Sequence, residues 1–177
     1  MGTVAFTGYR LQKMPFPEDE KNDLYIRFRE QELKIINRLI ELGYTDFISG
    51  VAQGFDTWTA EDVLSLKKKN KSITLECAIP CPQQDNQWSA DDQRRRKKIL
   101  RHATSSITTG DYPSKANFLK RNRYMVDKAD VVVCAYDGQS GGTAYTVNYA
   151  LNNDKIVIQI NPQTAKVSII SRRTFET

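Results

Sequence analysis

Short apolar runs rich in β-branched residues alternate along this chain with longer stretches of helical periodicity. The runs have the length and composition of buried strands, and they lie at residues 3–7, 46–49, 73–79, 105–109, 131–136 and 156–160. The helical stretches lie between them, at residues 57–69, 90–102, 117–128 and 144–152. This alternation predicts an α/β fold with a mostly parallel sheet and helices on both faces.

Two further elements are predicted, a helix after the first run and a strand near the C-terminus. After the first run, Leu33, Ile36, Leu39 and Ile40 fall on one helical face, and Gly43 follows as the predicted C-cap of that helix. Near the C-terminus, residues 166–171 predict an edge strand. The sequence shows no linker, internal repeat or low-complexity segment, so residues 1–177 are predicted to form a single domain.

Composition argues against several classes of protein. The three cysteines predict neither a disulfide framework nor a zinc site, because their number is odd and no CxxC pair repeats. The single histidine, His102, is predicted to be structural. No apolar run approaches the ~20 residues that cross a bilayer, and the N-terminus has no signal-peptide pattern. We therefore expect a cytoplasmic protein with no membrane partner, no metal and no cofactor.

The formal net charge is +5 and the isoelectric point is about 9.1, which admits an anionic partner. The basic clusters at residues 67–69 and 94–98 fall in predicted helices, where charge usually marks a solvated face. The sequence has no recognition-helix signature and no interleaving of aromatic and basic residues typical of an RNA-binding sheet. These features predict that nucleic acid is an unlikely partner.

Ligands of parallel α/β proteins bind beyond the carboxyl ends of the strands, and two early junctions carry suitable residues. Gly8 ends the first predicted strand, and Arg10 follows with a guanidinium suited to phosphate or carboxylate. After the second strand, Gly50 and Gly54 allow close backbone approach to a ligand. Asp56 either caps the next helix or accepts hydrogen bonds from a sugar or an amine.

The junction after residues 131–136 is the strongest candidate. Asp137 opens a turn that ends in Gly141, Gly142 and Thr143, and a helix is predicted to follow directly. Backbone N–H groups and a hydroxyl would converge there in a geometry suited to phosphate, although the lysine of a Walker A loop is absent. Arg121 and Asn122, on the preceding helix, are placed to reach toward the same turn.

Taken together, these residues resemble the YpsA-like branch of the SLOG superfamily. That resemblance extends over nearly the whole chain, and it implies a Rossmann-like fold that holds a nucleotide or a nucleotide-derived ligand. Histidine is usual in that branch where Tyr9 stands. The matching segments are residues 7–10, 49–58, 78–80, 121–130 and 136–143.

A more distant likeness joins the chain to the LOG phosphoribohydrolases, which cleave N-glycosidic bonds. Their motif continues with two glutamates, whereas this chain has Tyr145 and Thr146, neither of which can act as a carboxylate beside an oxocarbenium-like centre. The likeness rests on Arg121, Met125, Ala129, Asp130, Gly142 and Thr143.

We therefore expect a sensor or a sequestering protein for a nucleotide-like small molecule. The predicted site holds a phosphate at Gly141, Gly142 and Thr143 with help from Arg10 and Arg121, and it turns Gly50, Gly54 and Asp56 toward the sugar. Two alternatives stay open: an N-glycosidic-bond hydrolase with Asp56 or Asp137 as its acid, and a nucleic-acid-binding protein. Because related proteins often assemble, a homo-oligomer is a further expectation.

Overall fold

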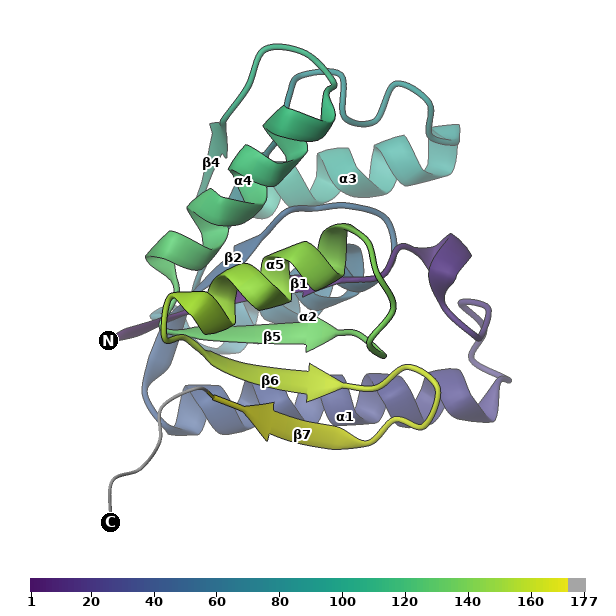
Figure 1. The fold of residues 1–177 in the computed structure, drawn as a ribbon, viewed down its shortest axis with the longest axis vertical. Helices are drawn as coiled ribbons and strands as arrows, with labels where there is room; N and C mark the ends of the chain where they lie inside the picture. Colours follow the sequence, from purple (N-terminus) through teal and green to yellow (C-terminus); the bar gives the residue numbers. More distant parts are fainter. Residues whose placement is uncertain (172–177) are drawn as a thin grey trace.

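The computed structural model describes residues 1–171, which form an α/β sandwich around one sheet (Figure 1). The strands are β1 (Gly2–Gly8), β2 (Tyr44–Ser49), β3 (Thr74–Ile79), β4 (Ser105–Thr108), β5 (Val131–Ala135), β6 (Ile156–Ile160) and β7 (Val167–Ile170). The helices are η1 (Leu11–Lys13), α1 (Asp23–Glu41), α2 (Phe55–Lys69), α3 (Ala90–His102), α4 (Lys115–Lys128) and α5 (Gly142–Asn152). The alternation predicted from the sequence is confirmed, including the edge strand near the C-terminus. The prediction that the run at 105–109 forms a buried strand is wrong, because β4 lies at the other edge of the sheet and is exposed along its whole length.

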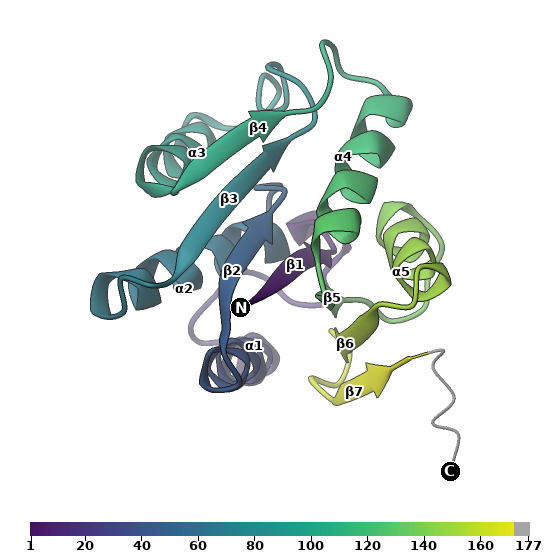
Figure 2. The same cartoon turned by 90° about the vertical axis from the view of Figure 1, so that its left-hand side faces the viewer.

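The strand order in the sheet is β4-β3-β2-β1-β5-β6-β7. All neighbouring strands are parallel except β6 and β7, which are antiparallel. The chain places β2, β3 and β4 in turn on one side of β1. It then crosses back and places β5, β6 and β7 in turn on the other side of β1. Because crossovers in parallel sheets are right-handed, the helices of the two halves cover opposite faces. Figure 2 shows α1, α2 and α3 on one side of the sheet and α4 and α5 on the other.

Two apolar clusters hold these layers together. The larger lies between the sheet and α1 and α2, and it centres on aromatic rings that include Phe6, Phe28 and Trp58, all fully buried. The smaller lies between the sheet and α4 and α5, and it includes Met125 and Val132. β5 is buried along its whole length because both clusters cover it, which explains its uninterrupted apolar sequence.

Helix α1 differs from its prediction in one respect. Asn22 caps its start by accepting a hydrogen bond from the Tyr25 backbone N–H at 3.0 Å, and Gly43 ends it with a φ of +93°. The buried face runs through Tyr25, Phe28, Glu32, Ile36 and Leu39. Leu33 is 40% exposed and lies off this face, so the prediction that it shares one face with Ile36 and Leu39 is wrong. The reason is that a carboxylate, Glu32, occupies the buried position next to it.

No helix among residues 1–171 is long and apolar enough to cross a membrane.

Candidate functional site

The largest concentration of predicted site residues lies at the carboxyl ends of β1 and β5. These neighbouring strands belong to the two halves of the sheet, so the chain winds away from them in opposite directions and leaves a crevice. A pocket of about 510 Å³ occupies this place. It is lined by Thr7, Gly8, Tyr9, Arg10, Gln12, Lys13, Ala52, Asp56, Lys115, Phe118, Leu119, Arg121, Asn122, Gly142 and Thr143. We call it the switch-point pocket.

Four cationic side chains line this pocket: Arg10, Lys13, Lys115 and Arg121. The Arg10 guanidinium carbon lies 5.7 Å from the centre of the Phe118 ring, and that of Arg121 lies 6.0 Å from the same ring. Both distances are within the range of cation–π attraction, which holds guanidinium groups in place. Asp56 is the only carboxylate in the lining, so the pocket favours an anion.

Lys13 reaches the glycine-rich turn from the other half of the molecule. Its Nζ donates a hydrogen bond to the Ser140 carbonyl oxygen at 3.0 Å and lies 4.3 Å from the centre of the Tyr9 ring. The sequence indicated a phosphate turn that lacks the Walker A lysine. In the structure, a lysine 127 residues away along the chain stands beside that turn.

The turn itself has the conformation that its glycines predict. Gly141 is the N-cap of α5 with a φ of +144°, a value that side-chain-bearing residues rarely adopt. Gly142 begins the helix, is exposed, and would have open space around an added Cβ. The N-terminal N–H groups of α5 have no partner within the helix, and the helix dipole adds positive potential there. An anion in the pocket can bind at this helix end.

Arg121 forms the floor of the pocket and is 4% exposed. Its Nη1 donates to the Gly50 carbonyl at 2.7 Å and to the Ala78 carbonyl at 3.1 Å, and its Nε donates to Asn122 Oδ1 at 2.8 Å. These bonds fix the guanidinium between three segments of the chain. Burial lowers the pKa of Arg121, against the opposite effect of Asp56.

Asp56 lies in the first turn of α2 and is 5% exposed. It does not cap the helix, because Gly54 holds the N-cap position. Its Oδ1 is buried and has no hydrogen-bond partner among residues 1–171. Burial raises the pKa of Asp56 to about 6, although Arg121, the Ala52 backbone and Arg10 act to lower it. Of the two roles that the sequence left open, the structure therefore excludes capping.

Four predicted site residues lie outside the lining of this pocket. Gly50 lies beneath it, where an added Cβ would stand 2.4 Å from Arg121 Nη1 and 2.8 Å from Asp56 Oδ2. Gly54 supports the turn after β1, with its Cβ position 2.8 Å from the Tyr9 carbonyl. Gly141 caps α5. These glycines shape the pocket from behind.

Asp137, the fourth, is held away from the pocket by its own partners. It accepts a short hydrogen bond from the Tyr9 hydroxyl and further bonds from the Gln139 N–H and from Gln163 Nε2. Burial and this contact with Asp137 raise the pKa of Tyr9 to about 12. The pKa of Asp137 is lowered: desolvation acts to raise it, but the Tyr9 bond and the others outweigh it. Asp137 thus joins the ends of β1 and β5.

Lys13, Lys115 and Phe118 line the pocket but were not predicted from the sequence. Lys13 lies in the 3₁₀ turn η1, which has no periodic signature. Lys115 and Phe118 lie in the first turn of α4, which begins two residues before its predicted start. Ser114 was the available signal, because its side chain caps this helix by accepting from the Asn117 N–H at 3.1 Å.

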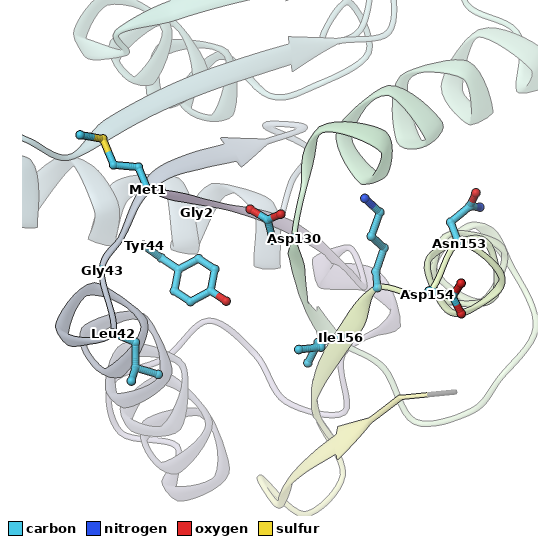
Figure 3. A pocket seen from close by; sticks show the side chains of 10 residues that line it. Met1, Gly2, Leu42, Gly43, Tyr44, Asp130, Asn153, Asp154 and Ile156 are labelled. Carbon is cyan, nitrogen blue, oxygen red and sulfur yellow. The ribbon is translucent and has the colours of Figure 1, made fainter. Parts of the chain in front are cut away.

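A second hollow, of about 610 Å³, lies at the opposite edge of the sheet, where the strands begin. Figure 3 shows Leu42 and Tyr44 on one side of it and Asn153 and Asp154 on the other. Asp130 in this lining already accepts the Thr3 N–H at 2.8 Å. The hollow holds no convergent cations and no buried unpaired side chain, and no metal-ligand cluster occurs anywhere in residues 1–171.

Solved structures that share this fold include two of a DNA processing protein. DNA processing protein A (DprA) from Streptococcus pneumoniae superposes with a TM-score of 0.62 at 21% identity, over 90% of this chain and 50% of that one. DprA from Helicobacter pylori, described for its single-stranded DNA binding mode, gives 0.62 at 20% identity, over 90% of this chain and 65% of its own. The chain therefore spans between half and two thirds of the DprA chains, and the likeness concerns the fold.

This comparison shows that one expectation was wrong. Nucleic acid was predicted to be an unlikely partner because recognition helices and RNA-binding aromatic patterns are missing. The same fold occurs in DNA-processing proteins, one of them described by how it binds single-stranded DNA. The physical reason is that a single strand needs only a cationic groove and stacking surfaces, and neither leaves a sequence motif of those kinds.

Relatives in sequence cover most of the chain. The SPbeta prophage-derived protein YoqJ of Bacillus subtilis is 35% identical over 144 residues, which are 73% of this chain and 84% of YoqJ. A UPF0398 protein of Bacillus pumilus is 30% identical over 156 residues, 86% of this chain and 83% of its own. The family model described as the YspA SLOG family matches residues 4–164. This chain, with its Rossmann-like sheet and its glycine turn at the start of α5, therefore belongs to the YspA SLOG family.

Proposed function

We propose that this protein binds single-stranded nucleic acid and holds one nucleotide unit of the strand in the switch-point pocket. The observation that carries the proposal is the convergence of Arg10, Lys13, Lys115 and Arg121 on one pocket that also contains the N-terminus of α5. Cations and helix N-termini both favour phosphate oxygens. A strand presents one such phosphate for every nucleotide.

The pocket also offers surfaces on which a base can stack. The Phe118 ring is half-buried and lies within 6.0 Å of two guanidinium groups. Aromatic rings and guanidinium planes both stack on bases without regard to sequence, which is how many proteins hold single strands. The fold likeness to DprA supports the same class of ligand, because one DprA is described by its single-stranded DNA binding mode.

A free nucleotide is a second candidate, and the size of the pocket favours it. A volume of about 510 Å³ lies within the range of small-molecule sites. Asp56 and Arg121, both nearly fully buried, lie in its lining. A protein with this ligand would act as the sensor or the sequestering protein that the sequence suggested.

Fluorescence anisotropy with labelled single-stranded oligonucleotides of about 12 nucleotides tests the proposal, since single-strand sites span about 4–16 nucleotides. The logarithm of the binding constant should fall linearly with the logarithm of the salt concentration, and the slope should be about −0.7 for each phosphate contacted. Arg10→Gln and Lys115→Gln should weaken it, whereas Lys68→Gln, on the exposed end of α2, serves as the matched control.

The outcomes separate the two candidates. If strands bind tightly and mononucleotides are weak competitors, the ligand is a nucleic acid. Tight binding of mononucleotides without binding of strands favours the second candidate. If Lys68→Gln weakens strand binding as much as Arg10→Gln does, the site lies elsewhere and the proposal fails.

A further inference from the structure

We propose that Asp56 accepts a hydrogen bond from a ribose 2′-hydroxyl, so that the switch-point pocket selects ribonucleotide strands over deoxyribonucleotide strands. This inference rests on the proposed function and names the sugar of its ligand.

The first observation is the buried, unpaired oxygen. Asp56 lines the pocket and is 5% exposed, yet its Oδ1 has no hydrogen-bond donor among residues 1–171. Buried polar atoms are nearly always paired, and an orphan at a pocket wall calls for an explanation. Burial raises the pKa of Asp56 to about 6, so at neutral pH the carboxylate is an acceptor with no donor to offer in return.

The second observation is the charge around this carboxylate. The other charged groups in the lining are all cations, which together prefer an anionic ligand. A cationic ligand group beside Asp56 would meet Arg10 and Arg121, both near enough to affect its pKa. The partner that suits Oδ1 is therefore a neutral donor carried by an otherwise anionic molecule. A nucleotide combines a phosphate with hydroxyl and amine donors of this kind.

The third observation concerns position across the sheet. Asp56 follows β2, Arg10 follows β1 and Gly142 follows β5, and these strands are neighbours in that order. The start of α2 lies against the turn that carries Arg10, because an added Cβ at Gly54 would stand 2.8 Å from the Leu11 backbone nitrogen and 3.0 Å from the Arg10 carbonyl carbon. Asp56 therefore lies beside the place where Arg10 would hold a phosphate. The sugar is bonded directly to the phosphate, whereas the base amines lie farther along the nucleotide. A sugar hydroxyl is therefore the nearest neutral donor.

Strand chemistry narrows the choice to one hydroxyl. Within a strand the 3′ and 5′ oxygens are esterified, so the 2′-hydroxyl is the only sugar donor left, and deoxyribose lacks it. A deoxyribonucleotide would leave Oδ1 unpaired in the complex, and sites that leave a buried polar group unpaired discriminate strongly.

The test compares oligouridine and oligodeoxyuridine of about 12 nucleotides, which share a base and differ only at the 2′ position. We expect the wild-type protein to bind the ribo strand tighter by about tenfold or more, the effect of one hydrogen bond to a charged acceptor. 2′-O-methyl oligouridine, which has lost the donor, should bind like the deoxy strand. This arm needs no variant and holds even if Asp56 variants fold poorly.

Two variants locate the effect. Asp56→Asn should reduce the preference for the ribo strand, measured as the ratio of the two affinities, because the loss of its charge affects both strands alike and cancels in that ratio. Arg10→Gln should weaken both strands equally, because phosphate is common to them. Equal binding of ribo and deoxy strands by the wild type overturns this inference and leaves the proposed function standing. Binding of neither strand overturns the proposed function itself.

Discussion

Gly50→Ala should destabilise the fold because the added methyl group meets the floor of the switch-point pocket. The new Cβ would stand 2.4 Å from Arg121 Nη1, 2.7 Å from Arg121 Cζ and 2.8 Å from Asp56 Oδ2. Arg121 has no room to yield freely, since Nη1 is bonded to the Gly50 and Ala78 carbonyls. Gly50 does not have a positive φ, so the effect is one of contact alone.

The size of the loss in the free energy of unfolding follows from the contacts of Arg121 that must change. Overpacking a core by one methyl group costs about 1–3 kcal/mol. Each lost hydrogen bond from a charged group costs about 1.5–3 kcal/mol. Because Arg121 can shift and keep part of its bonding, we expect a loss of about 2–4 kcal/mol in the free energy of unfolding. In a domain of this size, that corresponds to a fall in Tm of roughly 4–16 °C.

Urea unfolding followed by circular dichroism measures this loss, and Gly142→Ala is the matched control. It adds the same methyl group where no atom lies within 4 Å of the new Cβ. Its stability should stay unchanged or rise by up to about 1 kcal/mol, since alanine restricts the unfolded chain. If Gly50→Ala loses less than about 0.5 kcal/mol, the range of ordinary surface substitutions, the reasoning about Arg121 is refuted.

Three further predictions concern binding and pH. Gly142→Val should leave Tm nearly unchanged but abolish ligand binding in calorimetry, because its side chain blocks approach to the α5 N-terminus; unchanged affinity would count against the phosphate position. Arg10→Gln should lower the salt dependence of strand binding by about 0.7 in log–log slope, and an unaltered slope would remove Arg10 from the phosphate contacts. The pKa of Asp56 is raised from 3.8 to about 6, so the wild type should lose up to roughly 3 kcal/mol relative to Asp56→Asn as pH rises from ~4 to ~7. Urea unfolding at several pH values checks this, and a constant difference between the two proteins would contradict the burial argument.

Strand positions could be predicted because most strands are short runs rich in apolar and β-branched residues. The run before Asp137 is the clearest case, since β5 is covered on both faces. The end of α1 was also readable, because Gly43 supplies the positive φ that ends a helix. Leu33 was misplaced because helical periodicity takes only hydrophobicity into account. The buried position belongs instead to Glu32, whose Oε2 lies 3.1 Å from Arg29 Nε.

The pocket was only half predictable for a different reason. Gly142 and Arg10 stand at strand ends, and strand ends of a parallel sheet meet at one edge. Lys13 joins them through its own side chain, from a 3₁₀ turn whose course no local pattern specifies. Asp137 follows a strand in the same way as Arg10, but its hydrogen bond from Tyr9 turns it into a structural link. Such pairings depend on tertiary contacts that spacing does not encode.

The order of the strands also sets when this site can exist. The lining comes from residues 7–56 and 115–143, and the contact between Lys13 and Ser140 joins positions 127 residues apart. As the chain is synthesised, β1, β2 and β3 can pair early, but β1 must wait for β5 before the pocket has its second wall. A chain arrested before α5 would have a sheet without a site. Ligand can therefore stabilise only a chain in which both halves of the sheet have folded, and ligand binding can be used to detect that state.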